Sequence, residues 1–335
     1  MNRSDFLIRL LSYYADTHCK YSIFIADASN PEHVKITKNA LKQLNEKLHI
    51  MYYEYPGLSI EECTRRLIQL VSTPYVVFVA DDDFLITNGL EQCVQFLENH
   101  PDYIAAHGMA VRFRLRSNGS YGKFLGCSPY KLPVIEANTA SQRLIEHLQN
   151  YSVTLFCVHR IEGWRAMYPD DVHFTDKAFG AELLPCCLSV IYGKIKQLNS
   201  FYLMRQDHSK RYLLPDVDTW VQGSTWKQEY KIFRNRLAQE LMRIEKISEA
   251  DAAHIVDTAF QSYLDTFCKN YKTRIQNAFA SIPGIRYVLR MLKYIWFNRS
   301  GDLSLPMLLR STSPYHNDFM PAYRSITIPS ELVQK

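Results

Sequence analysis

The sequence predicts an α/β protein in which a mostly parallel sheet is flanked by helices and a helical region follows at the C-terminal end. Two observations predict this fold class. In the first hundred residues, short runs of β-branched and aromatic residues alternate with stretches of helical spacing, and such alternation is typical of a parallel sheet. From Ser224 onward only helical patterns remain, rich in Lys, Arg and aromatic residues.

The first helix is expected to begin at Ser4, because Phe6, Leu10 and Tyr14 recur at helical spacing. Ser59 and Glu62 form a capping-box pattern, which predicts the start of another helix at Ile60. The strands expected in this half of the chain are 21–26, 49–55 and 75–80, and the helices that follow them are 31–47, 60–71 and 88–99.

The middle of the chain is more mixed, and the end is helical. Strands are expected near 104–110, 153–159 and 195–203, and helices at 136–150, 175–190, 227–242, 248–278 and 285–297. The change in character predicts a first domain over 1–222 and a helical region over 223–335. Residues 283–299 interleave aromatic and basic side chains, which favours either contact with an anionic membrane surface or a core helix with a solvated basic face.

Composition and charge set limits on the function. The 335 residues include 47% hydrophobic and 22% charged residues, which is ordinary for a globular protein with a sizeable core. A net charge of +5 is too small to indicate nucleic-acid binding, so we expect no nucleic-acid partner. The eight cysteines contain no CxxC pair, and no signal peptide or membrane-spanning run is visible. We therefore expect reduced thiols and a cytoplasmic location, with the inner face of the membrane as the alternative.

The strand expected at 75–80 ends in three consecutive carboxylates, Asp81, Asp82 and Asp83. Adjacent acids repel one another, so they either bind a cation or face water. The end of a strand in an open α/β sheet is a common place for ligands, and hard oxygen ligands suit Mg²⁺ or Mn²⁺ bound to phosphates. The pattern thus predicts a divalent-metal site for a phosphorylated ligand, with a solvated acidic turn as the alternative.

Several segments match a known family when they are taken in order. These are Ile23–Ser29, the helix with Arg65 and Arg66, Ser72–Leu85, and further along Tyr151–Arg160 and Phe179–Leu184. Over about residues 1–215 the chain resembles the GT-A glycosyltransferases, in particular bacterial relatives of glycosyltransferase family 2. The resemblance implies a GT-A (Rossmann-like) fold and a metal-dependent, inverting reaction. In it a sugar moves from a nucleotide-sugar donor to a glycan or lipid-linked acceptor in surface polysaccharide synthesis.

The chain departs from the family pattern in two ways. The acidic motif is Asp81-Asp82-Asp83 without the usual intervening residue, which leaves open which carboxylate binds metal. The family's first strand would precede Asn2-Arg3, so we expect that strand to be missing. Either the start lies at an internal Met or the edge of the nucleotide pocket is built differently.

The residues and the resemblance together suggest roles for particular side chains. The predicted metal ligands are Asp83, Asp82 and His208, with Mn²⁺ or Mg²⁺ as the ion. The predicted donor and nucleotide contacts are Asp27, Arg65, Arg66, Asp81, Asp82, Arg205 and Arg211. For some of these the alternatives are plain: an Asx-turn for Asp27, and a solvated loop for the segment from Arg205 to Arg211.

An inverting displacement also needs a carboxylate that takes the proton of the acceptor hydroxyl. Glu182 is the first candidate, because its apolar helix neighbours would raise its pKa. Asp176 is the second, although capping a helix is the more ordinary role for it. His159 is a candidate acceptor contact, or else a strand-end histidine bonded to the backbone.

Two other functions remain open at this point. One is a non-catalytic member of the same fold that binds nucleotide or glycan, or that serves as a scaffold. The other is a sugar-phosphate nucleotidyltransferase, which would need a Gly-rich phosphate loop near the N-terminus; the sequence contains none.

Overall fold

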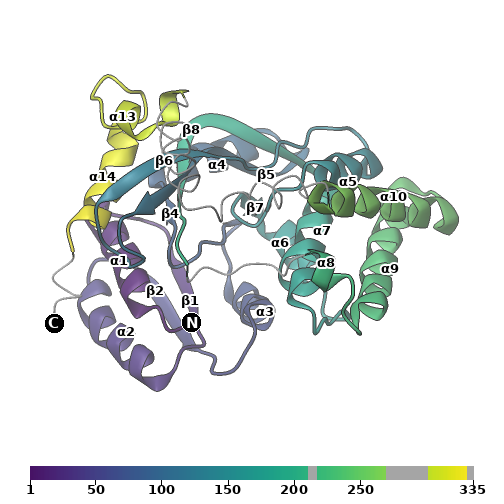
Figure 1. Cartoon of the computed structure of the whole chain (residues 1–335), viewed down its shortest axis with the longest axis horizontal. Coiled ribbons are helices and arrows are strands. Elements are labelled where there is room, and N and C mark those ends of the chain that lie inside the picture. Colours follow the sequence, from purple (N-terminus) through teal and green to yellow (C-terminus); the bar gives the residue numbers. More distant parts are fainter. Residues whose placement is uncertain (210–216, 269–300, 330–335) are drawn as a thin grey trace, which may run out of the picture.

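A computed structural model describes residues 1–209, 217–268 and 301–329 (Figure 1). The first part of the chain alternates helices and strands as expected, with boundaries within a few residues of the prediction except at the short strand β3 and the additional strand β4. Its elements are α1 (Ser4–Asp16), β1 (Ile23–Asp27), α2 (Pro31–Leu44), β2 (Ile50–Glu54), α3 (Ile60–Leu70), β3 (Tyr75–Val76), β4 (Phe84–Leu85) and α4 (Thr87–Asn99). The predicted capping box starts α3: Glu62 N donates to Ser59 Oγ at 3.2 Å, and Ser59 N donates to Glu62 Oε2 at 2.8 Å.

The later elements include several that the sequence did not predict, namely the strand β6 and the helices α6, α8, α13 and α14. In chain order they are β5 (Tyr103–Leu115), β6 (Phe124–Tyr130), α5 (Ala140–Gln149), β7 (Val158–Arg160), α6 (Ile161–Met167), a π-helical turn η1 (Phe179–Leu183), α7 (Leu184–Tyr192) and β8 (Lys194–Gln206). The helices beyond residue 216 are α8 (Val217–Trp220), α9 (Trp226–Glu245), α10 (Glu249–Cys268), the 3₁₀ turn η2 (Gly301–Leu303), α13 (Leu305–Leu308) and α14 (His316–Thr327). The expected helix at 285–297 lies outside the described residues.

The strands form two sheets. β1 and β2 pair in parallel, and a six-stranded sheet has the order β3-β7-β5-β8-β4 with β6 paired to β5. The α/β fold class is confirmed, but within the described six-stranded sheet only β5 and β8 are parallel. The reason lies in the connections: β5 and β6 are joined by a short loop, which permits an antiparallel pair and not a parallel one.

The strand predicted at 75–80 is shorter than expected. Only Tyr75 and Val76 pair with β7, which is itself three residues long, and the β1–β2 sheet does not pair with residues 77–80. The chain then turns, with Asp83 N donating to Ala80 O at 3.1 Å, and enters β4 at Phe84. The three acids therefore lie in a tight turn between two short strands.

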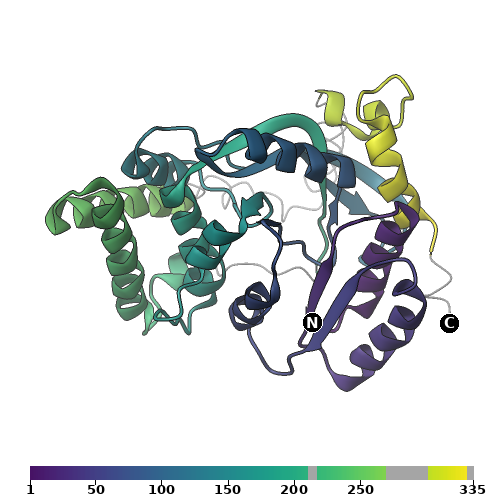
Figure 2. The same ribbon diagram turned by 180° about the vertical axis from the view of Figure 1, so that it is seen from behind.

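The helices pack into shared cores at the two ends of the six-stranded sheet (Figures 1 and 2). One core joins α5, α6 and α7 to α9 and α10, with Phe179 in contact with Trp220, Phe233 and Phe260. Another joins α1 and α2 to α14. The helices after residue 222 thus share cores with the part before it, and the proposed boundary between 222 and 223 stays a prediction.

Among the described residues, no helix has both the length and the apolar character that crossing a bilayer requires. The segment 283–299, predicted as a membrane contact, lies outside the described residues.

Candidate functional site

In the acidic turn Asp81–Asp83, Asp82 and Asp83 are buried and Asp81 is partly exposed, and each carboxylate is paired with a cationic side chain. Arg3 Nε donates to Asp81 Oδ2 at 3.1 Å, and Arg3 Nη1 donates to Asp82 Oδ2 at 3.1 Å. His208 Nε2 lies 2.7 Å from the same Asp82 oxygen. Asp83 is fully buried and accepts from Arg205 Nε at 2.8 Å and from the backbone N–H of Gln206 at 3.1 Å. The alternative of a solvated acidic turn is therefore wrong.

Helix α1 provides cations that the sequence analysis missed. Its N-cap residue is Arg3, and Arg9 is fully buried. Arg9 Nη1 donates to Gln206 Oε1 at 2.6 Å, and Arg9 Nη2 donates to the Asp82 carbonyl at 2.8 Å. Burial lowers the pKa of Arg9 to about 10, so it stays charged at neutral pH. An arginine between Ile8 and Leu10 on an otherwise apolar helix face was the available signal.

The three carboxyl groups differ in their pKa. Burial raises the pKa of Asp83 to about 6, although the Arg205 charge opposes the change. Burial also raises the pKa of Asp81, against the charge of Arg3. At Asp82 burial acts in the same direction, but the contact with His208 and the charge of Arg3 outweigh it and lower the pKa. Asp82 is thus the carboxylate that is most firmly held in its charged form.

Glu182 lies on the π-helical turn η1, a rare geometry that is often found at functional sites. The Tyr151 hydroxyl donates to its Oε1 at 3.0 Å. Burial raises the pKa of Glu182, while the Tyr151 hydrogen bond and the Arg205 charge act the other way. The Arg205 charge is the smallest of these influences, and among the described residues no hydrogen bond joins Glu182 to the acidic turn.

Asp176 has a structural position. Its Oδ1 accepts from the N–H groups of Ala178 at 2.7 Å and Phe179 at 3.3 Å, and its Oδ2 accepts from Trp220 Nε1 at 2.6 Å. Both oxygens are used inside the protein, which fits the helix-capping alternative.

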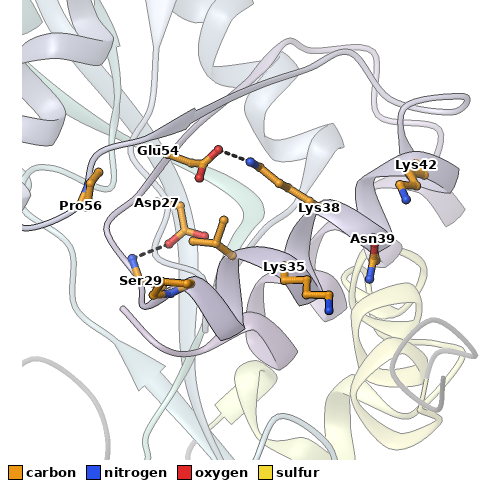
Figure 3. A pocket seen from close by; sticks show the side chains of 10 residues that line it. Asp27, Ser29, Lys35, Lys38, Asn39, Lys42, Glu54 and Pro56 are labelled. Atoms are coloured by element: carbon orange, nitrogen blue, oxygen red, sulfur yellow. Dashed lines mark hydrogen bonds and ion pairs between the residues drawn. The ribbon is translucent and has the colours of Figure 1, made fainter.

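Asp27 lies at the end of β1, in a turn where Ser29 Oγ accepts from the backbone N–H of Asn2 at 2.8 Å. Its Oδ1 accepts from Ser29 N at 2.8 Å, which is the expected Asx-turn, and its Oδ2 accepts from the Tyr52 hydroxyl at 2.7 Å. Asp27 borders a pocket of about 530 Å³ between α2 and the end of β2 (Figure 3). Lys35, Lys38, Asn39, Lys42, Glu54 and Pro56 line the same pocket.

The two arginines of α3 differ. Arg65 donates to the carbonyls of Tyr168 at 3.0 Å and Val172 at 3.3 Å and to Glu61 Oε1 at 2.7 Å, so it anchors α3 to the loop after α6. Its position does not fit the predicted nucleotide contact, because its donors are used within the protein. Arg66 is exposed, with its guanidinium carbon 5.4 Å from the centre of the Tyr55 ring.

His159 does not fit the predicted acceptor contact either. It is fully buried, its Nε2 lies 2.9 Å from the Thr154 carbonyl, and its ring packs edge-on against Trp164. Burial lowers its pKa to about 4, so the ring is neutral at physiological pH. The backbone-bonded alternative describes it. Arg205 and His208 do meet the acidic turn as expected, whereas Arg211 lies outside the described residues.

The predicted metal ligands do not converge. Asp82 touches His208, but Asp83 faces Arg205 and Gln206 instead. Within residues 1–209, 217–268 and 301–329, no three His, Cys, Asp or Glu side chains form a group that could hold a metal ion. As they are arranged, these residues do not fit Mn²⁺ or Mg²⁺, since five of the six carboxylate oxygens of the turn are already bonded to nitrogen donors.

Comparisons with known proteins identify the fold. No protein-family model matches the sequence, and no curated protein matches it. Among solved structures, the chain is similar to S. aureus TarS 1-349 in complex with UDP-GlcNAc, at 14% identity and a TM-score of 0.50, over 79% of this chain and 70% of that one. The chain has a TarS-like fold. A second structure of TarS 1-349 aligns over 97% of this chain and 79% of that one, at 12% identity and a TM-score of 0.47. At such an identity the likeness to TarS shows a shared fold alone.

Proposed function

We propose that this protein is a glycosyltransferase, a bacterial relative of glycosyltransferase family 2. It would move a sugar from a nucleotide-sugar donor to a glycan or lipid-linked acceptor in surface polysaccharide synthesis. The fold it shares with TarS, which was crystallised with UDP-GlcNAc, supports this proposal. The observation that carries it is the position of Arg205, whose guanidinium bonds Asp83 in the acidic turn and is 27% exposed. The cytoplasmic location expected from the sequence remains part of the proposal.

Arg205 is suited to the donor side of such a reaction. Its Nε donates to Asp83, and its Nη1 donates to the Tyr130 hydroxyl at 2.7 Å. Its Nη2 donates no hydrogen bond to any described residue. The guanidinium lies 4.1 Å from the centre of the Phe156 ring, which fixes its plane. A fixed guanidinium with a free donor can bind a phosphate oxygen and stabilise the charge that develops on a leaving diphosphate.

Glu182 is suited to the acceptor side. The Tyr151 hydroxyl bonds Oε1, and Oε2 accepts no hydrogen bond from any described residue. The hydrogen bond to Oε1 holds the carboxylate in place, and burial raises its pKa. The other oxygen, Oε2, can then take a proton from an acceptor hydroxyl. We assign this role to Glu182 rather than Asp176, because both oxygens of Asp176 are used in capping and in the Trp220 bond. Such a base corresponds to an inverting displacement.

Incubation with a panel of nucleotide sugars and glycan acceptors tests the proposal, with release of the nucleotide as the measurement. We expect release with one donor class, and we expect Glu182→Gln to lower kcat by about 100-fold or more while nucleotide affinity stays the same. If no nucleotide sugar of the panel is bound or consumed, the proposal is wrong.

One observation favours a second function. The carboxylates of the acidic turn are all paired within the protein, which would also suit a non-catalytic member that binds nucleotide or glycan. Nucleotide binding without turnover for every donor and acceptor would favour this second function over the first.

A further inference from the structure

The acidic turn carries its own counter-charges. Its three carboxylates face three guanidinium groups, those of Arg3 and Arg205 in direct ion pairs and that of Arg9 through the Asp82 carbonyl. His208 adds a fourth basic side chain, 2.7 Å from Asp82. The charge of the turn is thus balanced before any ligand arrives, and little net negative charge remains to attract a divalent cation.

These cations are built into the fold. Arg9 is fully buried between the Phe6 and Phe84 rings, at 5.1 and 4.7 Å from their centres. Phe6 in turn stacks on His208 with ring centres 4.9 Å apart. A divalent ion at Asp83 would have to displace Arg205 and leave its guanidinium without that partner, and separating a buried ion pair costs several kcal/mol.

Two of the cations reach the surface of the cluster. The side chain of Arg205 is 27% exposed, that of Asp81 is 22% exposed and that of Arg3 is 16% exposed, whereas the carboxylates of Asp82 and Asp83 are almost completely covered. A ligand that approaches from solvent therefore meets Arg205 and the Arg3–Asp81 pair before it meets Asp82 or Asp83. Planar guanidinium groups match the geometry of phosphate oxygens, which carboxylates repel.

We infer that Arg205, with Arg3, takes the charge-neutralising role of a divalent ion, so that a nucleoside diphosphate binds at the acidic turn without metal. This inference rests on the proposed function, because it concerns the diphosphate of the same nucleotide-sugar donor. It is an alternative to the metal dependence that the family resemblance implied.

Isothermal titration calorimetry with UDP, GDP, CDP and dTDP on the full chain tests the inference, once in EDTA and once in MnCl₂. We expect at least one nucleotide to bind in EDTA with a Kd within about threefold of the value in MnCl₂. Titration with MnCl₂ alone should show no stoichiometric binding. The variant Arg205→Met should raise the Kd about tenfold or more in both buffers, which corresponds to about 1.4 kcal/mol.

Two controls separate binding from folding. Arg234→Met removes an arginine that is paired with Asp257 on α10, at 2.7 Å and away from the acidic turn, and it should leave the Kd unchanged. The double variant Arg205→Met/Asp83→Asn removes the buried ion pair without leaving a charged carboxylate at position 83. Thermal melting of this variant tests whether the fold is retained. Its Kd should rise as in the single variant.

The outcomes are distinct. Nucleotide binding that requires MnCl₂ would overturn this inference and leave the glycosyltransferase proposal standing. An unchanged Kd in the folded double variant would overturn the role of Arg205. If none of the four nucleotides binds in either buffer, both the inference and the proposed function are wrong.

Discussion

Arg205 Nε donates to Asp83 Oδ2 at 2.8 Å, and this bond joins the end of strand β8 to the acidic turn that precedes β4. The next residue, Phe84, pairs with Met204 where β4 and β8 run antiparallel. This strand pairing keeps Asp83 and Arg205 opposite each other. Asp83 is fully buried, and the Gln206 N–H bonds its second oxygen. The ion pair therefore has a structural role beside the one proposed for ligand binding.

Loss of one member of this pair should destabilise the protein strongly. Arg205→Met leaves the Asp83 carboxylate buried without its cation, and we expect the free energy of unfolding to fall by about 3–5 kcal/mol. The double variant Arg205→Met/Asp83→Asn should recover a large part of this loss, since no uncompensated charge remains. Urea unfolding of the wild type, both single variants and the double variant measures the coupling. Additive losses would show that the pair does not act as a unit.

The Tyr151–Glu182 bond should control the pH dependence of catalysis. Glu182 must be deprotonated to act as a base, so activity should rise with pH through its pKa. The Tyr151 hydrogen bond lowers that pKa, and Tyr151→Phe removes it. We therefore expect the acidic limb of the kcat/KM profile to move to higher pH in the variant.

A matched tyrosine provides the control for this profile. Tyr103 donates to Glu136 Oε1 at 2.6 Å in an exposed position on the far end of β5, and Tyr103→Phe should leave the profile unchanged. If Tyr151→Phe lowers activity equally at every pH, the hydroxyl holds the fold and does not tune Glu182.

The local patterns predicted the elements of the first half well, because helical spacing, the Ser59–Glu62 capping box and apolar runs each act over a few residues. The sequence could also place the acids at a strand end with Arg205 and His208 as partners, since all of them follow apolar strands. It could not show that β7 is too short to pair with residues 77–80, because pairing depends on distant segments. That pairing decides where the strand ends.

The burial of single polar residues was also beyond the sequence. Arg65 and His159 looked like ligand contacts, and only the tertiary structure shows that they bond to backbone carbonyls. Arg3 and Arg9 were missed because their partners lie more than seventy residues away in the sequence. Long-range ion pairs of this kind leave no local pattern.

Gly89 should be intolerant of any side chain. It lies on α4 against β8, and a Cβ atom there would come within 2.5 Å of the Phe201 carbonyl oxygen and 3.0 Å of the Tyr202 Cα. Because both contacts are backbone, α4 would have to shift away from the strand that carries Arg205. We expect Gly89→Ala to lower the free energy of unfolding by about 1–3 kcal/mol. Gly119→Ala, where no atom lies within 4 Å of the added Cβ, is the control for urea unfolding. Equal stability of the two variants would contradict the close packing of α4 on β8.

His147 should make the protein less stable as the pH falls. Neither ring nitrogen has a hydrogen-bond partner among the described residues, and burial lowers the pKa of His147 from 6.5 to about 3. Between these values the unfolded chain binds a proton that the folded chain does not, so stability falls as the pH drops below 6.5. Asp83 opposes this trend, because its pKa is raised to about 6 and the folded state binds its proton first.

The variant His147→Leu separates the two effects, since it removes the histidine and keeps Asp83. A leucine of similar size has no charge to desolvate. Between pH 8 and pH 5, the free energy of unfolding of the variant should therefore rise by about 2 kcal/mol relative to that of the wild type. Urea unfolding at both pH values measures this gain. His254→Leu, on α10 at an exposed position, should show no comparable change. A gain that is the same at pH 8 and pH 5 would mean that the replacement improves packing and that proton binding to His147 has no part in acid unfolding.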